Sequence, residues 1–366
     1  MIYLDYNATT PVLPEVMNSM TPFFLKQWGN PSAVYPFGEN AANAIENARQ
    51  QVANLIGADA KEILFTSGAT ESNQTILART TGSILTSSVE HSSINDFIKT
   101  RDQTISIPVD TNGLIDLNYL DSELNKNKIG LVSCIWANNE TGVISPIQEV
   151  SEICNKHGVL FHSDAVQAVG KIPIDVSKTP VNYLSLSAHK FFGPKGIGAI
   201  YIRKGSPFHP LVFGTQEEGK RGGTEAVPLI VGFGKAAELA KKELKQRSEI
   251  MCNMRNILEK FILETIPSAY INGDQHNRLP NTLNIGIPNV DSDMIVQLLG
   301  REGIMISNGS ACKSQAITPS HVLLAMGRSY EQANEALRFS VSHLTTEQEI
   351  KELTNKIPVI TSLQLD

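Results

Sequence analysis

One lysine of this chain stands between a strand end that carries hydroxyl and imidazole groups and a glycine-rich turn. Residues 185–196 read SLSAHKFFGPKG, with Lys190 at the centre. A lysine amine can form a Schiff base with the aldehyde of pyridoxal phosphate, and flanking serine and histidine side chains can bind a phosphate group. A lone lysine before Gly-Pro is more often a solvated turn residue. The motif therefore predicts a Schiff-base lysine only if other cofactor-binding groups lie near it.

A carboxylate lies upstream of this motif, at the end of another expected strand. Asp164 comes just after the apolar run 159–162, so we expect it at the carboxyl end of a strand, facing a partly buried site. A buried carboxylate is unfavourable unless it meets a cation, and a protonated pyridine nitrogen is such a cation. Gln167 could donate to a ring oxygen of the same ligand, although by itself it reads as a helix-surface glutamine.

Three further groups with suitable chemistry follow other expected strands. Residues 67–70 (SGAT) separate a strand from a helix, where free backbone N–H groups and the helix dipole favour a phosphate. His91 could stack on a cofactor ring and move protons, and Asn139 could bind ligand oxygens. Each of these alone reads equally well as a turn, cap or core residue. Ligands in α/β folds bind at the carboxyl ends of the strands, so the convergence with Lys190 and Asp164 predicts one shared cofactor site.

The elements that must position these groups alternate along the chain. Helical stretches separate several apolar runs, which we expect to be strands: 62–66, 83–86, 130–135, 159–162, 183–186 and 197–202. This alternation predicts an α/β layer with a mostly parallel central sheet, in which the last two runs could pair antiparallel.

Other segments predict how the chain divides. A helix over 38–56 should end at Gly57, and a long helix over 227–265 should lead into a smaller α+β unit. We expect a large α/β domain over residues 15–255, and a small domain formed by residues 1–14 and 256–366.

Composition excludes several classes of function. The 366 residues carry a formal charge of −6, which offers no basic face for direct nucleic acid binding. The N-terminus shows no signal peptide and no apolar run reaches membrane-spanning length, so we expect a cytoplasmic protein with no membrane contact. The four cysteines form no Cys-x-x-Cys pair, which argues against a zinc site or a disulfide framework and predicts free thiols.

One of the cysteines differs from the other three in its surroundings. Cys312 stands in residues 307–314 (SNGSACKS), a run of small polar residues that predicts a flexible loop. Lys313 beside it would favour the thiolate, which is the nucleophilic form. Without the cofactor motifs this would read as an incidental exposed cysteine; with them it predicts a nucleophile that can approach the substrate.

Together the motifs resemble those of the class V aminotransferase family and, within it, the NifS/IscS-type cysteine desulfurases. The similar segments follow one another over nearly the whole chain: 3–11 (YLDYNATTP), 66–72 (TSGATES), 138–142 (NNETG), 161–167 (FHSDAVQ), 187–196 (SAHKFFGPKG) and 337–340 (LRFS). The resemblance implies a fold-type-I pyridoxal-phosphate enzyme that acts on L-cysteine. It also implies a homodimer with active sites at the subunit interface, and a protein that accepts the sulfur.

The resemblance further assigns roles to individual residues. Lys190 would be the Schiff-base lysine, Asp164 the partner of the pyridine nitrogen, and His91 the stacking ring. Cys312 would attack the sulfur, becoming a persulfide and releasing alanine. Other residues would bind the cofactor, with Thr224 reaching in from the second subunit: Ala69, Thr70, Asn139, Gln167, Ser187, His189 and Thr224. Binding of the substrate would use Arg338, Asn7 and Asn139, with Arg338 bound to the carboxylate.

Some features of the chain depart from the family pattern. Residues 307–312 (SNGSAC) and 214–217 (GTQE) replace the more usual SSGSAC and GGQE, and the chain ends 26 residues after Ser340. Delivery of sulfur to an iron–sulfur scaffold is therefore a weaker expectation than desulfuration, and tRNA thiolation or another pathway stays open. The alternatives are a selenocysteine lyase or aminotransferase of the same family, or a catalytically silent scaffold.

Overall fold

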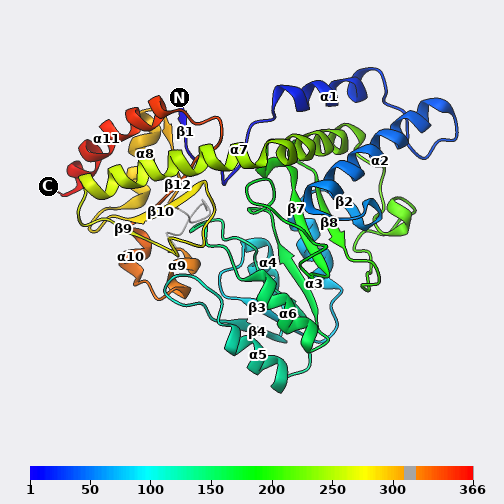
Figure 1. Cartoon of the computed structure of the whole chain (residues 1–366), viewed down its shortest axis with the longest axis horizontal. Coiled ribbons are helices and arrows are strands. Elements are labelled where there is room, and N and C mark those ends of the chain that lie inside the picture. Colours follow the sequence, from blue (N-terminus) through cyan, green and yellow to red (C-terminus); the bar gives the residue numbers. More distant parts are fainter. Residues whose placement is uncertain (309–318, 366) are drawn as a thin grey trace.

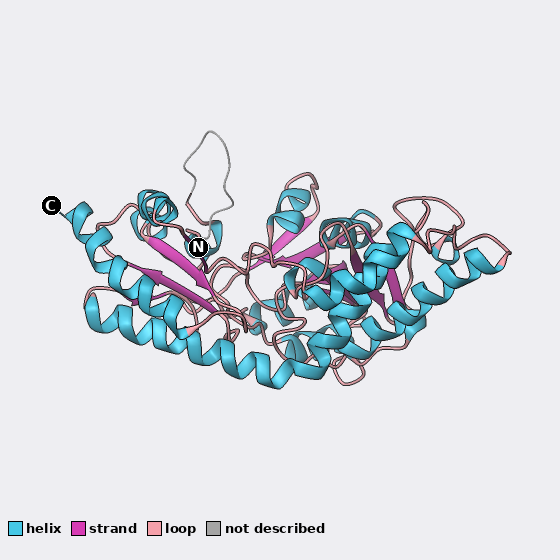
Figure 2. Cartoon of the chain, turned by 90° about the horizontal axis from the view of Figure 1, so that it is seen from above, coloured by secondary structure: helices cyan, strands magenta, loops and turns pink. Residues whose placement is uncertain are grey.

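The computed structural model describes residues 1–308 and 319–365, with side chains as far as residue 357. Its strands form a seven-stranded sheet, a three-stranded sheet and a two-stranded pair within the described ranges (Figure 1). Figure 2 shows the strands gathered in two groups along the long axis of the molecule, with helices packed along them.

The larger sheet has the order β2-β8-β7-β6-β5-β3-β4 and is parallel except for β8, which runs antiparallel to both neighbours. Its strands are β2 (Ile63–Thr66), β3 (Ser83–Ser87), β4 (Thr104–Ile107), β5 (Ile129–Ser133), β6 (Leu160–Asp164), β7 (Tyr183–Ser187) and β8 (Gly198–Ile202). The predicted mostly parallel sheet is confirmed, and so is the antiparallel pairing of its last two strands. Strand β4 was not among the expected runs.

Helices cover this sheet and fill its core. They are α1 (Pro14–Leu25), α2 (Pro36–Ile56), α3 (Ala69–Ala78), α4 (Ser92–Ile98), α5 (Leu117–Lys126) and α6 (Ile147–Lys156), with the short turns η1 (Ala60–Glu62), η2 (Ala188–Lys190) and η3 (Glu217–Gly219). The apolar face of α2 buries Ala41, Ile45 and Val52. The helix ends as predicted at Gly57, whose φ of 72° is a left-handed conformation that glycine adopts without strain.

The smaller group of elements follows and also includes the start of the chain. It holds β9 (Tyr270–Ile271), β10 (Thr282–Gly286) and β12 (Ala336–Ser340), the parallel pair β1 (Ile2–Tyr3) and β11 (Ile304–Met305), and the helices α8 (Ser292–Arg301), α9 (His321–Ala325), α10 (Tyr330–Asn334) and α11 (Glu347–Leu365). Because β1 pairs here while α1 packs on the larger group, residues 5–10 must cross between the two.

The long helix α7 (Val227–Thr265) joins the two groups, as Figure 1 shows in yellow-green. Its first turns bury Ile230 and Phe233 in the core of the larger group, and its last turns bury Leu258 and Ile262 in the core of the smaller one. A single helix that contributes to both cores fixes their relative position. None of the described helices is long and apolar enough to cross a membrane.

We propose that the two groups are domains with the boundaries expected above, 15–255 against 1–14 and 256–366. The two largest apolar clusters, one in each group, support this division, although Met251 and Met254 already pack with the smaller group. A further cluster joins Val89 and Ile135 of the larger group to Val322 and Leu323 of the smaller one. Native-state hydrogen exchange should then reveal two protected units that meet near residue 250. A single unit that opens all at once would contradict the division.

Candidate active site

A cavity of about 520 Å³ opens where the carboxyl ends of β2, β3, β5, β6 and β7 meet. Its lining includes predicted site residues from each of these strand ends: Ala69, Thr70, His91, Asn139, Asp164, Gln167, Ser187, His189 and Lys190. The volume lies in the range of small-molecule sites. The structure thus brings together residues from five separate segments, as the convergence of strand ends predicted.

Asp164 ends β6 and is almost completely buried in the cavity wall, with an exposed fraction of 3%. Its Oδ1 accepts from the backbone N–H of Val166 at 3.0 Å, and its Oδ2 accepts from Nδ2 of Asn73 at 2.8 Å. Each oxygen of the Asp164 carboxyl group has a further lone pair. Asp164 can therefore accept another hydrogen bond from a protonated ring nitrogen.

Lys190 ends the turn η2 directly after β7 and lines the cavity beside the chain's first residues. Its Nζ donates to the carbonyl oxygens of Asn7, at 2.6 Å, and Ala8, at 2.9 Å. Burial lowers the pKa of Lys190 to about 8, assisted by the nearby Arg338 cation and opposed by Asp164. A large fraction of this amine is therefore neutral in weakly alkaline solution, which is the form that reacts with carbonyl carbons.

His91 precedes α4 and caps it, because its Nδ1 accepts from the backbone N–H of Ser93 at 3.2 Å. The ring remains open to the cavity. The surrounding protein lowers the pKa of His91 by desolvation, which outweighs the opposing effect of the Asp164 carboxylate. His91 therefore favours the neutral form at the cavity wall.

The opposite end of the cavity is suited to an anion. Helix α3 begins at Ala69, and its first backbone N–H groups have no partner within the helix itself. A Cβ built on Gly68 would meet no atom within 4 Å, so the glycine leaves this part of the cavity open. The side chains of Thr70, Ser187 and His189 line the cavity as well. This combination of N–H groups and hydroxyls fits a phosphate.

The side-chain amide of Gln167 is hydrogen-bonded to a buried lysine. Its Nε2 donates to the carbonyl of Asn7 at 3.0 Å, and its Oε1 accepts from Nζ of Lys171 at 2.6 Å. Lys171 also donates to Oδ1 of Asn7 at 2.9 Å. Because an amide nitrogen carries two hydrogens, Gln167 keeps one for a ligand in the cavity. The sequence analysis did not identify Lys171.

Lys171 allows a prediction about stability. Burial, aided by the Lys190 and Arg338 cations, lowers the pKa of Lys171 well below its usual 10.5. Between the lowered and the usual pKa the unfolded chain holds a proton that the folded protein lacks, so the free energy of unfolding rises with pH by up to about 1.4 kcal/mol per pH unit. Lys171→Met should reduce this slope in denaturant titrations at several pH values. Lys99→Met, at an exposed site, is the matched control; equal slopes in both variants would contradict the prediction.

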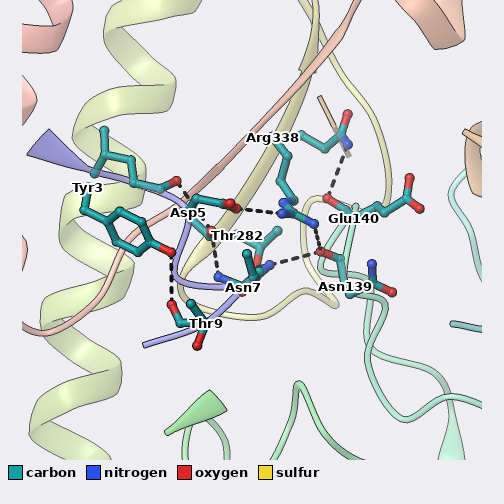
Figure 3. Close-up of polar contacts among 12 residues, drawn as sticks. Tyr3, Asp5, Asn7, Thr9, Asn139, Glu140, Thr282 and Arg338 are labelled. Carbon is teal, nitrogen blue, oxygen red and sulfur yellow. Dashed lines mark hydrogen bonds and ion pairs between the residues drawn. The ribbon is translucent and has the colours of Figure 1, made fainter. Parts of the chain in front are cut away.

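Arg338 lies beside the cavity and is already engaged by the protein, as Figure 3 shows. It is 6% exposed, its Nη2 contacts Oδ1 of Asp5 at 2.6 Å, and its Nη1 donates to the carbonyl of Asn139 at 3.1 Å. Its Nε has no hydrogen-bond partner within the described parts of the chain. The guanidinium thus keeps an unused donor near Asn139, which lines the cavity.

The side chain of Asn7 connects separate segments. Its Nδ2 donates to the carbonyl of Asn139 at 3.1 Å and to Oγ1 of Thr282 at 2.9 Å, and its Oδ1 accepts from Nδ2 of Asn281 at 2.9 Å as well as from Lys171. These bonds use both amide hydrogens and both lone pairs, and the residue is 1% exposed. The geometry favours a role for Asn7 in positioning the cavity wall over direct contact with a substrate.

Three of the expected site residues that the structure describes are absent from the cavity lining: Asn7, Arg338 and Thr224. Thr224 is exposed and lines a small neighbouring cavity of about 100 Å³ that shares Ser67 and Gly196 with the main one. Cys312 lies outside the described residues. The other three cysteines are free thiols as predicted; Cys134 and Cys154 are buried, whereas Cys252 is only half-buried.

Comparison with known proteins gives a consistent result. The aminotransferase class-V family model matches residues 2–353. A cysteine desulfurase of Sinorhizobium fredii is 45% identical to this chain and covers 98% of it and 96% of the relative. A solved NifS-like protein superposes with a TM-score of 0.92 at 37% identity, covering 99% of both chains. SspA solved in complex with cysteine matches with a TM-score of 0.82 at 34% identity, covering 94% of this chain and 100% of SspA.

The chain belongs to the class V aminotransferase family. The fold expected from the resemblance, a mostly parallel sheet flanked by helices, is therefore confirmed by both the architecture and the relatives.

The cavity of this class V chain fits pyridoxal phosphate, the cofactor of the family. The fit rests on three observed features: an amine at Lys190, a carboxyl group at Asp164, and an open anion site formed by Gly68 and the start of α3. The amine, the carboxyl group and the anion site all line the same cavity. No atom of the wall blocks the place that Gly68 leaves open.

Several residues of this class V site were missed by reasoning from the sequence. Asn73 donates to Asp164, and Ser93 forms a hydrogen bond with His91. Lys171 holds Gln167 in place, and Asp5 holds Arg338. Asn73 lies one helical turn after Thr70, so a helix starting at the phosphate site could have indicated that it faces the cavity wall. The contact between Arg338 and Asp5 joins residues 333 positions apart and leaves no local signal, whereas Ser93 and Lys171 lie two and four positions from the side chains that they contact.

Proposed function

We propose that this protein is an L-cysteine desulfurase that uses pyridoxal phosphate, converting L-cysteine to L-alanine and transferring the sulfur through Cys312. The observation that carries the proposal is the convergence of Lys190, Asp164 and His91 on one cavity beside an anion site. The family membership and the cysteine-bound state of SspA support the same substrate.

We assign cofactor binding and proton transfer to the residues that line the cavity. Ala69, Thr70, Ser187 and His189 would bind the phosphate, Asp164 would hold the ring nitrogen protonated, and Gln167 and Asn139 would bind nearby oxygens. A bound pyridoxal phosphate would supply an electron sink that stabilises negative charge on the substrate's Cα. Lys190, once free, would remove the Cα proton as the general base, and His91 would stack on the ring.

Sulfur transfer is assigned to Cys312. Its thiolate would attack the sulfur of the bound cysteine, so that an S–S bond forms as the Cβ–S bond breaks. The electron pair of the broken bond goes to carbon, which takes up a proton, and the product is alanine. The sulfur remains on Cys312 as a persulfide until an acceptor protein removes it.

The test of this function is an assay of the purified protein loaded with pyridoxal phosphate. L-Cysteine should give alanine and, with a reductant, sulfide in equal amounts. Transamination without sulfur release would instead support an aminotransferase. Faster turnover of L-selenocysteine with no sulfide from cysteine would support a selenocysteine lyase, and failure to bind the cofactor would support the silent scaffold.

Arg338 is proposed to bind the carboxylate of the substrate, because its unused Nε and its contact with Asn139 place a cation beside the cavity. Arg338→Ala should raise KM for cysteine by about 10- to 150-fold, the equivalent of about 1.5–3 kcal/mol for a charged hydrogen bond, with a smaller effect on kcat. Steady-state kinetics measure both. Arg301→Ala is the matched control: Arg301 is an exposed arginine in the last turn of α8 and does not line the cavity, so KM should not rise. An unchanged KM in Arg338→Ala would place the carboxylate elsewhere.

The proposed assembly is a homodimer in which Thr224 reaches the site of the second subunit. Large apolar side chains are uncovered at the end of α1 and in the connection to α2, with Trp28 70% exposed and Phe24 55% exposed. Phe213, in the loop that leads to Thr224, is 75% exposed. Uncovered apolar patches of this kind mark association surfaces. Sedimentation of a monomer at micromolar concentration would contradict this assembly.

The sulfur acceptor is proposed to be a protein, with iron–sulfur cluster assembly and tRNA thiolation as the candidate pathways. Radiolabelled sulfur from cysteine should pass from Cys312 to a thiol of the acceptor. Release of all the sulfur as free sulfide, with any candidate acceptor present, would argue against a protein partner.

A further inference from the structure

A series of hydrogen bonds links four side chains at the active-site cavity, from His91 to Asp164. His91 Nδ1 lies 2.9 Å from Oγ of Ser93, which accepts from Nδ2 of Asn73 at 2.8 Å, and the same Nδ2 donates to Oδ2 of Asp164 at 2.8 Å. Asn73, Ser93 and Asp164 are at most 8% exposed. These hydrogen bonds run along the cavity wall, which His91, Ser93 and Asp164 line, and join His91 to the carboxyl group.

The direction of each hydrogen bond follows from the chemistry of the groups. An ionised carboxylate only accepts, so the group facing Asp164 must be the NH₂ of Asn73 and not its oxygen. Both hydrogens of that NH₂ are then used, one on Asp164 and one on Ser93. The oxygen of Asn73 is buried with no partner among the described residues, so the Asp164 carboxylate and the Ser93 hydroxyl are what fix the orientation of the amide.

The same logic decides the tautomer of His91. Since Ser93 Oγ accepts from Asn73, its own hydrogen is available to His91 Nδ1. The backbone N–H of Ser93, which can only donate, points to the same nitrogen at 3.2 Å. Two donors facing Nδ1 together disfavour a proton there and place the ring hydrogen on Nε2; the hydroxyl, at 2.9 Å, is the closer of the two, and the backbone N–H at 3.2 Å alone holds Nδ1 less firmly.

We propose that Asn73 and Ser93 are positioning residues that hold His91 as the neutral Nε2–H tautomer and fix the orientation of the Asp164 carboxyl group before any ligand enters. His91 then takes part in the reaction as a hydrogen-bond donor through Nε2, and Nδ1 is closed to proton transfer. The tautomer is a property of the cofactor-free chain, whereas this consequence for catalysis rests on the proposed function.

The charged and titratable groups around His91 agree with this state. Asp164 favours protonation of the ring, whereas Lys190 and His321 oppose it, and Asp96 on α4 has a smaller favourable effect. His321 Nε2 contacts the carbonyl of Glu90, the residue before His91. The hydrogen bonds at Nδ1 must break if the ring is to become doubly protonated.

Two substitutions test different parts of the chain of hydrogen bonds. Ser93→Ala removes the hydroxyl donor to His91 and leaves the contact between Asn73 and Asp164 intact. Asn73→Asp replaces the shared donor by an acceptor, so that the Ser93 hydroxyl turns away from His91. Ser93→Thr keeps a hydroxyl at the same place and should restore the wild-type state, and Ser92→Ala is a matched control for substitution on the same helix turn.

The experiment uses the cofactor-free full chain labelled with ¹⁵N-histidine, whose ring nitrogen shifts distinguish the tautomers; His91→Gln identifies the His91 signals. We expect a single Nε2–H state at neutral pH in wild type, Ser93→Thr and Ser92→Ala, and a mixture with the Nδ1–H or charged form in Ser93→Ala and Asn73→Asp. An Nδ1–H or charged His91 in wild type would overturn the proposal, as would an unchanged tautomer in both test variants. If Asn73→Asp does not fold, the comparison of Ser93→Ala with Ser93→Thr decides alone.

A kinetic measurement on the loaded enzyme then tests the catalytic consequence. Ser93→Ala should lower kcat with little change in KM for cysteine, and Ser93→Thr should recover it. If the tautomer changes as expected but no variant, including wild type, releases sulfur from cysteine, the proposed function fails and the tautomer assignment stands. If wild type releases sulfur and the tautomer does not respond, the positioning role fails.

Discussion

Replacing Cys312 with alanine is expected to abolish sulfur release from L-cysteine while cofactor and substrate still bind. The thiolate is the only proposed acceptor for the sulfur, so without it the Cβ–S bond has no nucleophile to receive its sulfur atom. Alanine formation should fall by roughly 10³-fold or more, as happens when the nucleophile of a catalytic unit is removed. The visible absorbance of bound pyridoxal phosphate should remain and should still change on adding cysteine. Alanine analysis and persulfide labelling measure the loss.

The control for this substitution is another cysteine of the chain. Cys252 is half-buried on α7 beside Arg255, far along the chain from the cavity segments, so Cys252→Ala should keep persulfide formation. Buried Cys134 and Cys154 are poorer controls, because burial raises the pKa of each thiol and a substitution would disturb the core. Full sulfur release by Cys312→Ala would show that another group is the nucleophile.

The second large effect is expected for Lys190→Ala. This change removes the amine proposed to bind the cofactor covalently and to take the Cα proton. General-base catalysis alone contributes roughly 10²–10⁴-fold, so alanine formation should drop by at least that factor. The absorbance band of the covalently bound cofactor should disappear, and an added small primary amine should restore part of the rate.

Lys195→Ala is the matched control for this prediction. Lys195 lines the same cavity and belongs to the same motif, but it is exposed and no step of the proposed reaction uses it. Its variant should keep the covalent absorbance band. Loss of the band in Lys195→Ala with retention in Lys190→Ala would exchange the two assignments.

Much of the fold could be predicted because hydrophobic periodicity is a local signal. The apolar run at 159–162 became β6, and the long helical segment became α7 with the predicted bounds, ending at Thr265 just before Pro267. Strand β4 was missed: three of its four residues are not fully buried, so its pattern has little contrast. The smaller group, with the first residues of the chain in it, was expected from the sequence, but the parallel pairing of β1 with β11 was not.

The catalytic groups were predictable for a related reason. Lys190, Asp164 and His91 each follow a strand, and parallel strands bring their carboxyl ends to one edge of the sheet. Sequence order therefore determined both the type of chemistry and its approximate place. The Cys312 motif likewise depends only on neighbouring residues, and it lies outside the described structure.

Only the tertiary structure decided how these groups are held. The hydrogen bonds from Asn73 to Asp164, from Lys171 to Gln167, and from Arg338 to Asp5 join residues that are between 4 and 333 positions apart. Their directions depend on which side chains are buried together, since a donor or acceptor removed from water must find its partner within the fold. The residue types and their order along the chain were enough to predict the lysine, the carboxyl group and the thiol; the packing of the segments sets the hydrogen-bond partners that hold the described groups in place.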